Sequence, residues 1–266
     1  ECNRTIRFNW LYNHARALDA DYLATGHYAR VTKAENGSYQ LRRGIDEAQD
    51  QSYVLSVLNQ EHLAHALFPC GGFTKPQIRE LASKFGLPTA SKHDSQDLCF
   101  LGDGDYRRFL REHAPEIMQP GPIALANGEI IGEHNGLANY TIGQRKGIVA
   151  HGGQPLYVLS VNPYRNALIV GTRDQLGQST FTASQVSWQA GSAPSTEPFH
   201  AQVKIRYKAQ TVGASVTPLA GDRMHVQLDV PLRDITPGQG AVVYAGDLVL
   251  GLGIIEKRPE SEIEFA

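Results

Sequence analysis

Two cysteines are the residues of this sequence best suited to covalent chemistry. The first, Cys99, lies in the polar stretch Lys92–Phe100, KHDSQDLCF. A thiolate is the reactive form of cysteine, and polar or cationic neighbours favour its formation. The lysine and histidine that open the stretch would favour ionisation of Cys99, whereas its two aspartates would oppose it. The simpler interpretation is that Cys99 is a small buried hydrophobic residue between a leucine and a phenylalanine.

Cys2 is the second candidate thiol. It lies at the start of a predicted helix, where the helix dipole favours a thiolate. Cys2 and Cys99 could exchange directly only if the fold brings their α-carbons within roughly 7 Å. Such a pair would suit sulfur transfer, in which one thiol carries a persulfide and the other breaks the S–S bond after the outer sulfur is delivered.

A zinc site is the competing interpretation of the same cysteines. It would use Cys2, Cys70, Cys99 and either His27 or His93. These residues lack the short ligand spacings that structural zinc sites show, so we predict no metal site in this chain.

The bulk composition is that of an ordinary globular protein. The chain has 266 residues, of which 41% are hydrophobic, enough for two or three domains. It has no apolar run of about 18 residues and no secretory leader, and its cysteines are few and odd in number, so we expect a cytoplasmic protein with no membrane span. The net charge of −2 does not indicate a nucleic-acid binder, although a local basic face could still act as one.

The first elements predicted are a helix and a short buried strand. Residues 4–19 have a helical apolar repeat made of Ile6, Trp10, Leu11, His14, Ala15 and Leu18. The strand, residues 21–27, ends in Gly26 and His27. A helix that leads into a short apolar strand is typical of a parallel α/β sheet, whose ligands bind at the carboxyl ends of the strands. Gly26 and His27 are therefore candidate ligand contacts, unless they are only a turn glycine and a partly exposed histidine.

A hairpin and several helices follow. Residues 28–33 and 39–43 flank the turn signal Asn36–Gly37. A polar loop, residues 44–52, leads into helices predicted over 53–58 and 61–67. Thr74 is a good N-cap for a helix that Gly86 ends, and 105–113 is a further helix. These predicted elements flank the polar loop and the Cys99 stretch and would hold them in position.

The rest of the chain is predicted to be rich in strands. Asn127–Gly128 is a turn, and residues 155–161 and 166–171 form a hairpin. Alternating apolar residues over 201–207, 224–230 and 248–254 indicate an antiparallel barrel or sandwich. On one strand Lys204, Arg206 and Lys208 would form a row able to contact phosphates, or merely a solvated strand face.

The motifs of this sequence resemble those of one family from end to end. The matching stretches are CNRTIRF (2–8), ATGHYAR (24–30), LRRGID (41–46), DQSY (50–53), LFP (67–69), TKP (74–76), GLPTA (86–90), DSQDLCF (94–100), YTIGQRKG (140–147), KIRY (204–207) and TPGQ (236–239). In these motifs the chain resembles the C-terminal two-thirds of the bacterial tRNA-specific 2-thiouridylases.

The resemblance implies a fold of three parts. Residues 1–107 would be the remaining part of an α/β nucleotide-binding domain of the adenine nucleotide alpha hydrolase-like class. Residues 108–175 would be a small mixed α+β domain, and residues 176–266 an antiparallel β-barrel that contacts tRNA.

The resemblance also implies a reaction, the ATP-dependent replacement of the C2 oxygen of wobble uridine 34 by sulfur. ATP, with Mg²⁺, would adenylate that oxygen, Cys99 would carry the persulfide that attacks C2, and Cys2 would release the sulfur. The partners implied are the tRNAs for lysine, glutamate and glutamine and a persulfide donor. The contacts implied are Gly26 with ATP, and His27, Gln49, Asp50, Gln51, Arg206, Tyr207 and Gln239 with tRNA.

Two features of that family do not occur in these 266 residues. One is a glycine-rich pyrophosphate loop, and the other is an aspartate three residues before the first cysteine. We therefore expect this chain to be a fragment that is inactive alone. Two other functions remain open, namely a non-catalytic RNA-binding module and a thiol redox protein that uses Cys2 and Cys99 without nucleic acid.

Overall fold

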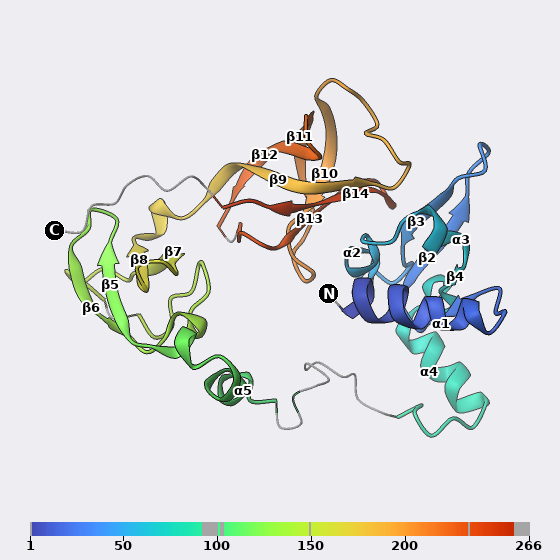
Figure 1. The fold of residues 1–266 in the computed structure, drawn as a ribbon, viewed down its shortest axis with the longest axis horizontal. Coiled ribbons are helices and arrows are strands. Elements are labelled where there is room, and N and C mark those ends of the chain that lie inside the picture. Colours follow the sequence, from blue (N-terminus) through green and yellow to red (C-terminus); the bar gives the residue numbers. More distant parts are fainter. Residues whose placement is uncertain (1, 92–100, 102–103, 149, 234, 258–266) are drawn as a thin grey trace. The chain divides into compact units, whose positions relative to one another are not determined.

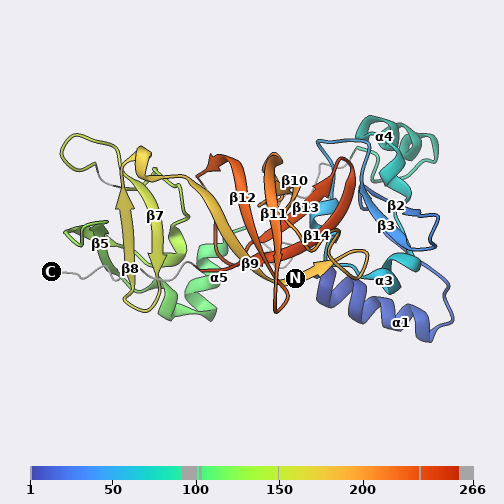
Figure 2. The same cartoon turned by 90° about the horizontal axis from the view of Figure 1, so that it is seen from above.

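The fold is described from a computed structural model, which describes residues 2–91, 101, 104–148, 150–233 and 235–257. The chain forms two compact units (Figures 1 and 2). Unit 1 comprises residues 1–92, 179–230 and 237–257, and unit 2 comprises residues 93–178, 231–236 and 258–266. The described helices include none long and apolar enough to cross a membrane.

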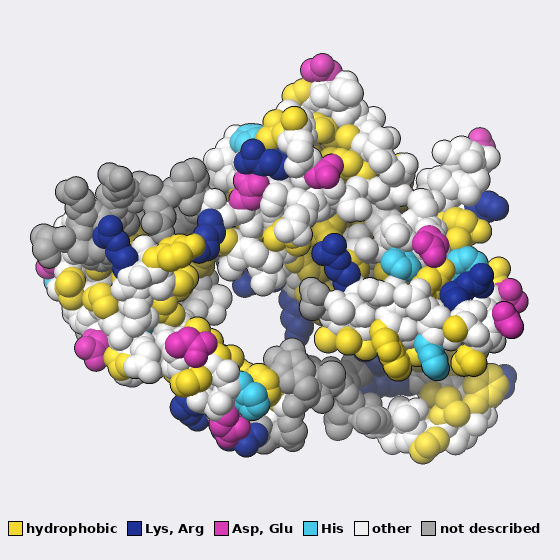
Figure 3. All heavy atoms as spheres, viewed as in Figure 1, with side chains coloured by type: hydrophobic (Ala, Val, Ile, Leu, Met, Phe, Trp, Pro, Cys, Tyr) yellow, Lys and Arg dark blue, Asp and Glu magenta, His cyan; other side chains and the backbone are white. Residues whose placement is uncertain are grey.

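Unit 1 begins with a helix whose first part has π-helical spacing. It consists of η1 (Asn3–Leu11) and α1 (Tyr12–Ala17). The predicted helix is confirmed, but its predicted apolar face is wrong, since Ile6, Trp10 and Leu18 are 55%, 64% and 71% exposed. A π-helix closes its hydrogen bonds five residues apart rather than four. This wider turn directs Asn3, Phe8 and Tyr12 inward instead, while hydrophobic side chains gather on the outer face of the helix (Figure 3).

Short parallel strands and helices complete the α/β part of unit 1. These are β1 (Leu23–Ala24), α2 (Ser52–Leu55), α3 (Gln60–Ala64), β4 (Ala66–Leu67), η2 (Pro69–Gly72) and α4 (Lys75–Lys84). β1 pairs in parallel with β4, so the helix predicted over 61–67 ends early and becomes a strand. The Thr74 cap is confirmed, because Thr74 and Gln77 form a capping box at the start of α4.

The predicted hairpin is confirmed as β2 (Ala29–Lys33) and β3 (Tyr39–Arg43). Gly37 occupies its turn with φ of +85°, a conformation that glycine adopts without steric cost. Asn36 accepts a hydrogen bond from the backbone of Ser38 at 3.0 Å. The hairpin is therefore specified by its own turn residues.

The last third of the chain forms the predicted barrel. Its strands are β9 (Gln178–Trp188), β10 (Phe199–Lys204), β11 (Val212–Leu219), β12 (Arg223–Leu232), β13 (Gly240–Ala245) and β14 (Leu248–Ile255). The strand order β13-β10-β11-β12-β9-β14 closes through an additional β13–β14 pairing, and β14 also pairs with β3 of the hairpin. The α/β part and the barrel thus share one sheet.

Two glycines of β14 allow the barrel wall to pack closely. A Cβ on Gly251 would lie 2.6 Å from the Trp188 ring, and one on Gly253 would lie 2.9 Å from Met224. Side chains would not fit at these positions. Gly251 and Gly253 therefore lie on the buried face of β14, and the larger leucines that alternate with them lie on its other face.

Unit 2 is a small mixed α+β unit with its own core. It contains α5 (Tyr106–His113), η3 (Pro115–Met118), β5 (Gly121–Leu125), β6 (Ile130–His134), η4 (Leu137–Asn139), β7 (Tyr157–Asn162), β8 (Ala167–Gly171) and η5 (Arg173–Gln175). The sheet order is β6-β5-β8-β7, with β5 and β8 parallel. Val158, Leu168 and Val170 are fully buried in the core. The fold class is as predicted, while the domain boundaries at 107/108 and 175/176 stay a prediction.

Candidate functional site

Gly26 and His27 follow the carboxyl end of β1, as predicted for ligand contacts. β1 and β4 run parallel, with Ala24 opposite Leu67. A Cβ built on Gly26 would meet no atom of the described residues within 4 Å, so the backbone there borders open space in the described part of the chain. A flat ligand such as a nucleotide base could approach the chain closely at this point. The expected contact of Gly26 with ATP stays a prediction.

His27 is buried and neutral at physiological pH. It is 8% exposed, and its ring packs against Phe8 and Phe68 at centroid distances of 6.4 and 6.0 Å. Burial, with the Arg7 charge adding to it, lowers the pKa of His27 to about 4. Its Nδ1 lies 2.7 Å from the Thr25 hydroxyl. His27 could therefore meet a nucleic acid as a neutral hydrogen-bonding group and not as a cation.

The polar loop 44–52 is held by the buried Asp50. The Asp50 carboxylate accepts hydrogen bonds from the backbone of Gly44 and Ser52, both at 3.1 Å, and from the Ser52 hydroxyl at 2.9 Å. Because these bonds occupy a carboxylate that is 6% exposed, Asp50 shapes the loop. Its direct contact with tRNA stays a prediction, as does that of the half-buried Gln49.

Gln51 joins the Gly26–His27 segment to the barrel. Its backbone donates to the Tyr28 carbonyl at 2.8 Å, and its side-chain oxygen accepts from the Tyr28 backbone at 3.0 Å. Its side chain also hydrogen-bonds Tyr207, which favours the phenolate, although burial has the larger effect and raises the pKa of Tyr207. The loop thus lies between the strand end and the barrel.

Arg206 and Tyr207 lie in a turn and not on a strand face. β10 ends at Lys204, so the predicted row of Lys204, Arg206 and Lys208 along one strand is wrong. The backbone turns after Ile205, whose side chain is fully buried in the barrel. Arg206 is exposed and Tyr207 half-buried, which leaves both side chains at the rim of the barrel.

Tyr53 connects this rim to Gln239. Its ring lies 6.4 Å from that of Tyr207, and its hydroxyl donates to the Gly240 carbonyl at 3.0 Å. Burial raises the pKa of Tyr53 to about 12, and the nearby charge of Arg206 opposes this rise. The structure therefore gathers Gln51, Arg206 and Tyr207, with Gln239 next to Gly240, around one edge of unit 1.

Arg43 is a residue of this edge that sequence reasoning missed. Its guanidinium lies 4.1 Å from the centroid of the Tyr244 ring. The charge of Arg43 in the LRRGID motif was visible in the sequence, but its stacking partner is distant along the chain. Only the pairing of the hairpin with the barrel brings the two together.

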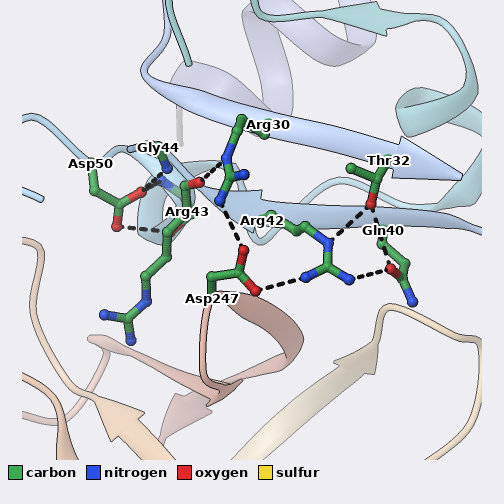
Figure 4. A network of polar contacts seen from close by, with 9 residues as sticks. Arg30, Thr32, Gln40, Arg42, Arg43, Gly44, Asp50 and Asp247 are labelled. Carbon is green, nitrogen blue, oxygen red and sulfur yellow. Dashed lines mark hydrogen bonds and ion pairs between the residues drawn. The ribbon is translucent and has the colours of Figure 1, made fainter. Parts of the chain in front are cut away.

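An arginine–aspartate network joins the hairpin to the barrel beside this edge (Figure 4). Asp247 accepts from Arg30 at 2.8 Å and from Arg42 at 2.7 Å. Arg42 also donates to Thr32 and Gln40, at 3.0 and 2.7 Å. One carboxylate in the β13–β14 turn thus fixes the position of both hairpin strands.

The cysteines are placed only in part. Cys2 is exposed just before η1, whereas Cys99 and its stretch lie outside the described residues, so the proposed pairing of the two thiols is untested. Cys70 is half-buried, and burial raises its pKa against the opposing effect of Lys75. Within the described ranges, no group of three or more His, Cys, Asp or Glu residues could hold a metal ion.

Three family models match the chain in sequence order. They are the tRNA methyl transferase HUP domain at residues 1–103, the tRNA methyl transferase PRC-barrel domain at 107–172, and the aminomethyltransferase beta-barrel domain at 178–255. The nucleotide-binding class of the first part and the barrel class of the last part are those expected from the sequence.

Curated relatives match nearly the whole chain. The tRNA-specific 2-thiouridylase MnmA of Chloroflexus aggregans is 48% identical over 98% of this chain and 72% of its own length. The enzymes of the same name from Moorella thermoacetica and a Synechococcus species are 46% and 43% identical, over 96% and 97% of this chain and 71% and 70% of their own lengths. With this identity and coverage, the chain belongs to the tRNA-specific 2-thiouridylase family, a family of tRNA-uridine 2-sulfurtransferases.

Proposed function

We propose that this protein, in its full-length form, thiolates C2 of wobble uridine 34 in tRNA, in a reaction that consumes ATP. The observation that carries the proposal is the match, over 98% of the chain, to an enzyme named tRNA-specific 2-thiouridylase. The cluster formed by Gln51, Arg206, Tyr207 and the neighbour of Gln239 supports it, because hydrogen-bonding groups, a cation and an aromatic ring suit a nucleic acid.

The first step of the proposed reaction activates the uridine. Its C2 oxygen attacks the α-phosphorus of ATP, which forms an adenylated uridine and releases pyrophosphate. Gly26 would lie against the nucleotide, where the backbone borders space that no described residue fills. Mg²⁺ would accompany ATP, and the neutral His27 would hydrogen-bond near the substrate rather than stabilise its phosphates by charge.

The second step transfers sulfur. The terminal sulfur of a persulfide on Cys99 attacks C2, AMP leaves with the former C2 oxygen, and a disulfide links Cys99 to the uridine. The Cys2 thiolate then attacks the Cys99 sulfur, which forms a Cys2–Cys99 disulfide and releases 2-thiouridine. A persulfide donor and a thiol reductant would restore the enzyme. The substrates proposed are the tRNAs for lysine, glutamate and glutamine.

Serine substitutions in the full-length protein test this proposal. Cys99→Ser should abolish 2-thiouridine, measured by mass spectrometry of tRNA nucleosides, and leave tRNA affinity unchanged. Cys2→Ser should accumulate a tRNA–protein adduct that forms only with ATP and that dithiothreitol cleaves. Cys70→Ser is the control, and it should retain thiolation because Cys70 has no role in the proposed reaction.

The results also separate the alternatives. Full thiolation by Cys99→Ser would overturn the proposed chemistry. Binding of tRNA by a protein that never thiolates, whatever its cysteines, would support a non-catalytic RNA-binding module. A thiol activity without any affinity for tRNA would indicate a redox protein.

A further inference from the structure

Arg43 has an environment that a structural role alone does not explain. Its guanidinium stacks on Tyr244, whose ring is fully buried. The Nε and one Nη of Arg43 are buried and have no hydrogen-bond partner among the residues that the structure describes. Figure 4 shows this side chain extending away from Asp50 and from the neighbouring arginines. Buried donors without partners cost free energy, so a native site that retains them calls for an explanation, of which a bound ion is one.

Lys204 is a second cation close to Arg43. It is the last residue of β10, its amine lies 6.0 Å from the centroid of the Tyr207 ring, and it is half-buried. Burial lowers the pKa of Lys204, the charge of Asp50 raises it, and the charge of Arg43 lowers it. In the barrel, Gln202 pairs with Tyr244, and Lys204 points to the same face as Gln202. Lys204 therefore lies on the sheet face that carries Tyr244, on whose ring Arg43 stacks, and the charges of the two cations act on each other.

The local charges do not balance. Asp50 is the carboxylate that acts on Lys204 and Tyr244, and its oxygens already accept from Gly44 and Ser52. Among the described residues, no ion pair joins Asp50 to Arg43 or Lys204. Of the carboxylates that the structure describes, Arg43 and Lys204 thus have only Asp50 nearby, and its oxygens are already occupied by hydrogen bonds. Because the site is partly desolvated, an additional anion would be bound favourably.

We propose that Arg43 and Lys204 together bind a phosphate of the tRNA backbone. The planar guanidinium of arginine suits a phosphate, and the compact amine of lysine adds a second positive charge. The proposal rests on the function proposed above and assigns a phosphate subsite to its tRNA-binding edge. We favour tRNA over ATP as the source of the phosphate, because the site adjoins candidate tRNA contacts. Lys204 lies over the ring of Tyr207, and Tyr207 hydrogen-bonds Gln51 and is affected by the charge of Asp50.

The test measures tRNA affinity against salt with charge-removing variants of the whole protein. We expect Arg43→Gln and Lys204→Gln each to weaken binding of labelled tRNA about three- to ten-fold at 0.1 M salt and to reduce the slope of log affinity against log salt by about 1. Arg43→Lys should keep the slope, because the charge remains.

Two matched controls carry the same charge change away from the site. Arg223→Gln alters an arginine that pairs with Glu256 elsewhere on the barrel, and Lys33→Gln alters a lysine above the Tyr39 ring at the far end of the hairpin. Both should leave affinity and slope unchanged. Tryptophan fluorescence would establish that each variant is folded, since Trp10 and Trp188 both lie in unit 1.

The outcomes distinguish this proposal from the proposed function. If the parent protein binds and thiolates tRNA while Arg43→Gln and Lys204→Gln match its affinity and slope, the phosphate subsite is wrong and the function stands. If the variants instead raise the KM for ATP with unchanged tRNA affinity, the site belongs to the nucleotide and the proposal is overturned. If the parent binds no tRNA, the proposed function and the subsite both fail.

Discussion

At the scale of single residues, burial decides the chemical state of the candidate contacts. His27 and Asp50 are both 8% exposed or less, but they differ in how their polar groups are satisfied. His27 is kept neutral by its apolar neighbours, whereas Asp50 accepts hydrogen bonds from the loop that it shapes. Both residues are therefore expected to affect the stability of the fold as well as the binding of a substrate.

The first residue-scale prediction concerns pH and His27. The unfolded chain protonates this histidine near pH 6.5 and the folded protein only near pH 4, so stability is lost as the pH falls through that window and is fully present above it. Between pH 7.5 and 4.5 the loss from His27 should be about 2 kcal/mol. Urea unfolding followed by tryptophan fluorescence measures it.

His27→Asn is the matched variant for this test. Asparagine keeps a polar atom near the Thr25 hydroxyl but does not titrate in this range. The pH dependence of its unfolding free energy should be smaller than that of the parent by the same amount. An equal pH dependence in both proteins would contradict the assignment of a neutral His27.

The second residue-scale prediction concerns Asp50. Asp50→Ala leaves the buried backbone donors of Gly44 and Ser52 without their acceptor, which should lower the unfolding free energy by about 2–3 kcal/mol. Glu47→Ala, an exposed acid of the same loop, should change it by less than about 0.5 kcal/mol. Equal stability of the two variants would show that Asp50 does not hold the loop.

At the scale of elements, contacts with the barrel position the hairpin and the loop. β3 pairs with β14, and Asp247 in the β13–β14 turn binds an arginine from each hairpin strand. Gln189, which follows β9, donates to the carbonyls of Ser56 and Leu58 after α2. These contacts orient the candidate edge, because its residues come from both parts of unit 1.

The element-scale prediction concerns Asp247. Asp247→Ala removes two partly exposed ion pairs, so its global cost should be only about 1 kcal/mol. The local effect should be larger, with faster hydrogen exchange at the amides of β2 and β3. Glu256→Gln, which weakens the pairing with Arg223 elsewhere on the barrel, should leave that exchange unchanged. Unaltered hairpin exchange in Asp247→Ala would contradict this role.

At the scale of the whole molecule, charge is nearly balanced while the candidate site is locally cationic. The chain has 25 Lys and Arg against 27 Asp and Glu. The attraction for a polyanion therefore depends on local clusters such as Arg43 with Lys204, and the net charge contributes nothing favourable.

The whole-molecule prediction is a steep salt dependence of tRNA binding. Since several phosphates would be neutralised at once, raising the salt from 50 to 200 mM should weaken affinity at least about ten-fold. Fluorescence anisotropy of labelled tRNA measures this, with an uncharged osmolyte as the control for solvent effects. Affinity that does not vary with salt would mean that tRNA is held without phosphate contacts.

The sequence by itself determined the family, the fold class and the elements with local signals. The Asn36–Gly37 turn, the Thr74 N-cap and the alternating strands were predictable, because each depends on hydrogen bonds or side-chain periods between near neighbours. The motifs also indicated which polar residues are candidates for the site.

Only the tertiary structure decided how those residues are presented. The π-helical spacing of η1, the burial of His27, the end of β10 at Lys204 and the stacking of Arg43 on Tyr244 were not predictable. The burial of His27 depends on packing against Phe8 and Phe68, and the stacking of Arg43 depends on packing of the hairpin against the barrel, so both require segments far apart in the chain. Local sequence patterns do not show which distant segments pack against each other. That packing sets the charge state and the exposure of each side chain.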